Sequence, residues 1–218
     1  MSTVELGAPR ETATESLPEL VAGLAVVVLT ILGLANVSPT FLVEIATIVF
    51  GVGLLLYGTA TLAMISRILA KETGVDGAAG AASGWAIVLV AGAAGIVLGI
   101  LALLGVSSIQ LVAIAVIAFG AALLISSNAS MRLRVLVGAP PSIDPTVERL
   151  VRDTAADTAG LQTMTGLAAI VLGILALSGF APTTFVLVAL LGLGCFATLT
   201  SAFISGAFAR AFRVAPRI

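Results

Sequence analysis

The chain contains no histidine and only one cysteine, Cys195. The usual ligands of zinc, haem and iron–sulfur clusters are therefore almost absent, and we predict no metal and no cofactor. Cys195 cannot form a disulfide within the chain. It lies inside the last apolar run, a setting typical of a small buried apolar side chain.

Charged residues are also scarce, at 10% of the 218 residues, whereas 60% are hydrophobic. A soluble domain usually carries about 25% charged residues. With so few charged residues, a globular protein in water could not cover its apolar surface. The sequence therefore predicts a protein embedded in a lipid bilayer. The formal net charge is −1 and no dense basic patch occurs, so nucleic acid is not an expected partner.

Catalytic motifs are missing too. The sequence has no P-loop, no glycine-rich dinucleotide fingerprint, no HExxH pair and no nucleophile triad. Enzymatic chemistry would rest on Glu44 and hydroxyls alone. We therefore predict that the protein is not an enzyme.

A repeated apolar stretch organises the sequence. The eight letters IVLGILAL at residues 96–103 return at 170–177, and a looser copy lies at 28–34. The offsets are 69 and 74 residues, and each copy precedes a short turn and a second long apolar run. The pattern predicts an all-α integral membrane protein with six transmembrane helices in three tandem helical-hairpin repeats.

The predicted boundaries follow the turns, linkers and prolines. The expected units are a tail at 1–16, hairpins at 17–70, 84–137 and 161–212, linkers at 71–83 and 138–160, and a second tail at 213–218. The second linker has a weakly amphipathic pattern after Asp144-Pro145. It predicts a helix that either lies on the membrane or runs straight into the next segment.

The distribution of positive charge predicts the orientation. All ten Lys and Arg residues fall in the tails or on the linker side of the hairpins, and the three hairpin tips carry no charge. By the positive-inside rule, both termini and both linkers are cytoplasmic, which we expect to be the inner side of a bacterial plasma membrane.

Glu44 is the only charged residue away from the linker side. It lies five residues past Pro39, so about 7.5 Å into its segment. An acid inside a membrane segment is a candidate for proton or cation handling, or for subunit contacts. Alternatively, its side chain reaches the outer headgroups and has no such role.

The second helix of each predicted hairpin becomes polar in its inner half. A candidate polar layer comprises Tyr57, Ser126, Ser127, Asn128, Thr200 and Ser201. These groups either line a vestibule or join helices by hydrogen bonds, as hydroxyls in membrane helices commonly do. Glycines at helix-packing spacing form a separate set, with Gly95, Gly99, Gly120 and Gly194 as the candidates for close approach.

Two copies of the motif VLGILAL, each before a short turn and an apolar helix, resemble the HdeD-like family of short-repeat bacterial inner-membrane proteins. The resemblance covers about residues 17–210 and implies a role in acid-stress resistance, with no catalytic residues. It departs from the family where Ser108 stands in place of the proline that begins the second helix of the other hairpins.

For function, the sequence predicts a non-catalytic scaffold or accessory protein, related to stress by this resemblance. Its expected partners are lipid, copies of itself and other membrane proteins. The alternative is a small channel or transporter that uses Glu44 and the polar layer.

Overall fold

The computed structural model describes residues 17–69, 75–136 and 145–213, and all of these residues except the three hairpin turns are helical. The helices are α2 (Leu17–Leu34), α3 (Pro39–Leu69), α4 (Val75–Leu103), α5 (Ser108–Leu136), α6 (Pro145–Leu177) and α7 (Pro182–Arg213). The predicted tails, and parts of both linkers, lie outside the described residues.

Two helices extend further than the predicted segments. Helix α4 begins at Val75, so most of the stretch expected to be a linker continues as helix. Helix α6 runs without interruption from Pro145, which matches the second of the two alternatives for that region. Proline at a first helical position costs no hydrogen bond, because the N–H group there has no partner within the helix.

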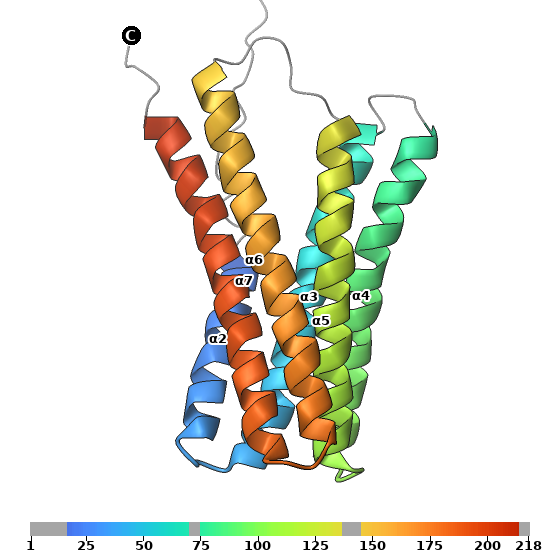
Figure 1. Cartoon of the computed structure of the whole chain (residues 1–218), viewed down its shortest axis with the longest axis vertical. Coiled ribbons are helices and arrows are strands. Elements are labelled where there is room, and N and C mark those ends of the chain that lie inside the picture. The colour runs from blue at the N-terminus through green and yellow to red at the C-terminus, as the bar shows by residue number, and fades with distance from the viewer. Residues whose placement is uncertain (1–16, 70–74, 137–144, 214–218) are drawn as a thin grey trace, which may run out of the picture.

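Each pair α2–α3, α4–α5 and α6–α7 is joined by a short turn at one end of the bundle, at the bottom of Figure 1. The second residue of each turn, Asn36, Gly105 or Gly179, has a positive φ, at 67°, 83° and 85° respectively. In the first two turns the next N–H donates to a carbonyl five residues earlier, the bond that closes a Schellman cap. All three turns share the residue of positive φ and the bond from its N–H group to a carbonyl three residues earlier.

The six helices form a closed ring in which each packs against its neighbour in the sequence and α2 packs against α7. Helices α3, α5 and α7 also contact one another across the interior. These three helices therefore lie inside, with α2, α4 and α6 between them on the outside.

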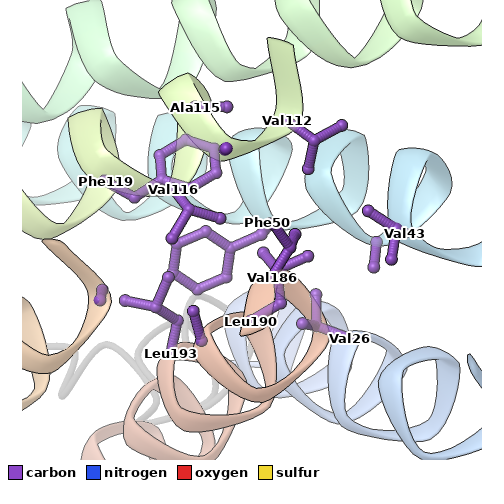
Figure 2. Close-up of a cluster of buried hydrophobic side chains, with 14 of the residues drawn as sticks. Val26, Val43, Phe50, Val112, Ala115, Val116, Phe119, Val186, Leu190 and Leu193 are labelled. Carbon is purple, nitrogen blue, oxygen red and sulfur yellow. The ribbon is translucent and has the colours of Figure 1, made fainter. Parts of the chain in front are cut away.

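The centre of the core consists of layers of apolar side chains from the three inner helices, and α2, α4 and α6 add further buried apolar residues around it. Phe50 and Phe119 meet edge to face with ring centroids 5.0 Å apart, and Leu193 lies beside them (Figure 2). Closer to the turns are two further buried layers, one of valines and one of alanines. Their members are Val43, Val112 and Val186, then Ala46, Ala115 and Ala189.

Candidate functional site

One candidate glycine, Gly120, lies where two helix backbones approach most closely. A Cβ atom built on Gly120 would lie 2.6 Å from the carbonyl oxygen of Gly166, and one on Gly166 would lie 2.8 Å from the oxygen of Gly120. Gly51 and Gly92 make the same reciprocal contact between α3 and α4. At these points any side chain would force the helices apart.

The other three candidate glycines lie against side chains of a neighbouring helix or at a wider distance from its backbone. A Cβ on Gly95 would collide with the Phe119 ring, and one on Gly99 would lie 2.5 Å from Cγ1 of Ile48. A Cβ on Gly194 would lie 3.3 Å from the oxygen of Gly23. All four candidates are buried, each against a neighbouring helix.

The candidate polar residues on α5 are joined to α6. Ser126 is fully buried, donates to the Leu123 carbonyl at 3.0 Å, and accepts a hydrogen bond of 2.7 Å from Nε2 of Gln162. Thr163 donates to Ser127 at 3.4 Å. These bonds tie two helices together, as hydroxyls and amides do in membrane bundles.

The polar candidates on α3 and α7 lie beside a small cavity. Tyr57 and Thr200 line a space of about 30 Å³, which is otherwise lined by apolar and small residues of α2, α3, α5 and α7. Thr200 shares its hydroxyl proton between the carbonyls of Phe196 and Ala197, each at 3.0 Å. Ser201 is buried nearby on α7, and the side chain of Asn128 lies outside the described residues.

Glu44 is buried, with only 6% of its surface exposed. It lies near the turn end of α3, where its backbone oxygen would be 3.4 Å from a Cβ placed on Gly99 of α4. Within the described part of the chain, no hydrogen bond or ion pair joins its carboxyl group to another residue. The sequence left its burial open, and in this structure neighbouring residues cover most of its surface.

Sequence reasoning missed several buried polar groups. Gln162 stood at the edge of a predicted segment, and only the α5–α6 contact shows that its amide reaches Ser126. Thr30 and Thr47 are fully buried, but each donates to a carbonyl four residues earlier in its own helix, at 2.8 Å. Across the described residues, no three His, Cys, Asp or Glu side chains gather as a metal site would require.

Five of the described helices are long and apolar enough to cross a membrane, namely α3 to α7. The chain is thus a multi-pass helical protein of the membrane class. Comparison with known proteins finds no family model, no curated protein and no solved structure that matches it.

Proposed function

We propose that this is a non-catalytic membrane protein that acts as a scaffold or accessory subunit, as an oligomer or within a larger membrane complex. The observation that carries the proposal is the apolar interior. The valine, alanine and Phe50–Phe119–Leu193 layers fill the centre of the inner helices from the turns to mid-bundle. Such a core holds helices together and offers no polar path for a solute.

The architecture proposed with it is three repeated hairpins and six spans. The close glycine contacts support the repeats. The contacts pair Gly51 with Gly92, Gly120 with Gly166, and Gly194 with Gly23. In both sets, Gly23, Gly92, Gly166 and Gly51, Gly120, Gly194, successive members are 69 and 74 residues apart, which are the repeat offsets. In each case the second helix of one hairpin meets the first helix of the next. The sixth span is α2, whose 18 residues extend about 27 Å, close to the hydrocarbon thickness of about 30 Å.

The test of this function is the mass of the assembled particle. Chemical cross-linking in intact membranes, followed by mild-detergent purification and native mass spectrometry, is expected to give a defined oligomer or complex. The same stoichiometry must appear before and after purification. A particle that stays monomeric in the membrane, together with solute flux through it in liposomes, would replace the scaffold with a transporter.

A transporter is the second candidate because Glu44 is buried in the half of the bundle near the turns. The polar groups Tyr57, Ser126 and Thr200 lie on the other side of the Phe50–Phe119 layer. A solute passing between the two polar regions would require that layer to separate. The alternative therefore requires a second conformation of the inner helices.

The proposed location is the bacterial inner membrane, with both termini and both linkers in the cytoplasm. The resemblance to the HdeD-like family adds a stress-related role to this proposal. The basis for the orientation is the charge distribution, because the three turns contain no Lys, Arg, Asp or Glu.

Single-cysteine labelling tests the orientation. In a Cys195→Ala background, Ser107→Cys lies in a hairpin turn and Ser142→Cys in a linker. A membrane-impermeant thiol reagent added outside intact cells is expected to label the first and spare the second. After the cells are opened, both should react, which controls for accessibility. The reverse pattern in intact cells would overturn the orientation.

A further inference from the structure

An apolar groove of about 340 Å³ lies between α6 and α7. Its walls include Met164, Ala168 and Leu172 of α6, and Val188 and Gly192 of α7. Met164 is 71% exposed and Val188 41% exposed, so both stand at the open surface of the bundle. The groove belongs to the outer face, separate from the cavity beside Tyr57.

The groove is open because Gly192 carries no side chain. A Cβ built on Gly192 would meet no atom within 4 Å, unlike the glycines at helix contacts. The positions one and two repeats earlier are Ala118 and Val49, both half-buried. At this depth α6 and α7 thus leave a space where the corresponding helices have a side chain.

The depth of the groove brings it level with lipid chains. The groove extends from Leu172 to Met164, which are five and thirteen residues from Leu177 at the turn end of α6. Measured from Leu177 along the helix axis, it therefore begins at about 7.5 Å and ends at about 20 Å. The hydrocarbon core is about 30 Å thick. Neither α6 from Gly160 onward nor α7 as far as Ser201 carries a charged residue.

We propose that this groove is a binding site for one acyl chain of a bilayer lipid from the leaflet on the turn side. Its length, about 12 Å, corresponds to two helical turns. The adjacent turn, Ser178–Ala181, has no charge to select a headgroup, so recognition depends on shape. The inference rests on the proposed membrane placement and repeat alignment.

Photolabelling tests the site with the whole protein in vesicles of phosphatidylcholine that carries a diazirine in mid-chain. We expect peptides around Ala168 and Gly192 to be labelled in excess of the equivalent α4–α5 peptides around Ala94 and Ala118. Gly192→Val should abolish that excess, because it supplies the side chain found at Val49. Ala93→Val, on the exposed face of α4, is the matched control and should leave the excess unchanged.

Several results would overturn the proposal. Equal labelling of the two hairpins, or an excess that survives Gly192→Val, would show that the groove holds no particular chain. Labelling below that of α4–α5, together with a dimeric mass, would assign the groove to a second copy of the protein. An excess that disappears with phosphatidylglycerol bearing the same chains would overturn recognition by shape. If no helix were labelled, the membrane placement itself would fail.

Discussion

Gly120→Ala is expected to lower the free energy of unfolding by about 1–3 kcal/mol, the usual cost of overpacking a tight interior. The new Cβ would lie 2.6 Å from the backbone oxygen of Gly166 and 2.9 Å from Cγ1 of Ile170. A rotamer change could move Ile170, but the oxygen belongs to the α6 backbone. The α5–α6 pair would therefore have to separate along its length and stretch the Gln162–Ser126 hydrogen bond.

Gly192→Ala is the matched control, because it makes the same change in a neighbouring inner helix with no atom within 4 Å of the new Cβ. Alanine has a higher helix propensity than glycine, so this variant should be as stable as the original protein or more stable, by up to about 1 kcal/mol. The measurement is a reversible unfolding curve in mixed detergent–SDS micelles. Equal destabilisation by both variants would show that the contact with Gly166 is not the cause of the cost.

Glu44→Leu is expected to raise the free energy of unfolding of the isolated protein by about 1–3 kcal/mol, the usual cost of a buried polar group left without a hydrogen bond. Glu44 is 6% exposed and has no hydrogen-bond or ionic partner among the described residues. The sequence offsets of 69 and 74 residues align Glu44 with Leu187 of α7, which is 2% exposed. A leucine is therefore already accommodated at this level of the fold.

Glu44→Gln is the companion variant, because it keeps the shape and polarity of the side chain and should fold like the original protein. If Glu44 has a function, the Glu44→Leu variant should be more stable than the original protein, since removing a polar functional group often stabilises a fold. The same variant should no longer form the oligomer or complex, or should no longer show solute flux in liposomes. A large loss of stability in Glu44→Leu alone would instead reveal a partner for the carboxyl group in the assembled protein.

The sequence predicted the helical class well because composition and length are enough for it. Apolar runs of about 20 residues with short turns between them can satisfy their backbone groups in lipid only as helices. Gly105 and Gly179 suit the turns in which they lie, because those positions adopt positive φ. Helix lengths were less predictable, since nothing in the Gly/Ala-rich segment after Val75 distinguishes a linker from a continuing helix.

The site was less accessible to sequence reasoning than the fold. The sequence placed Tyr57, Ser126 and Thr200 in one candidate polar layer. The structure places Tyr57 and Thr200 around one cavity, whereas Ser126 accepts a hydrogen bond from Gln162. A hydroxyl on a helix reaches its own backbone or a neighbour equally well, and position along the chain does not distinguish the two. Which helix a hydroxyl group faces depends on how its own helix is rotated about its axis in the bundle.

By itself, the sequence determined that this chain forms long apolar helices, that short turns join them, and that positive charge gathers at one end. These properties depend on local composition and on what lipid permits. Only the tertiary structure decided which glycines carry backbone contacts, that Glu44 is buried, and that Gly192 opens a groove. In a helix that is apolar on every side, no hydrophobic stripe marks the face that points into the bundle. The shapes of the side chains that pack between neighbouring helices determine which face that is.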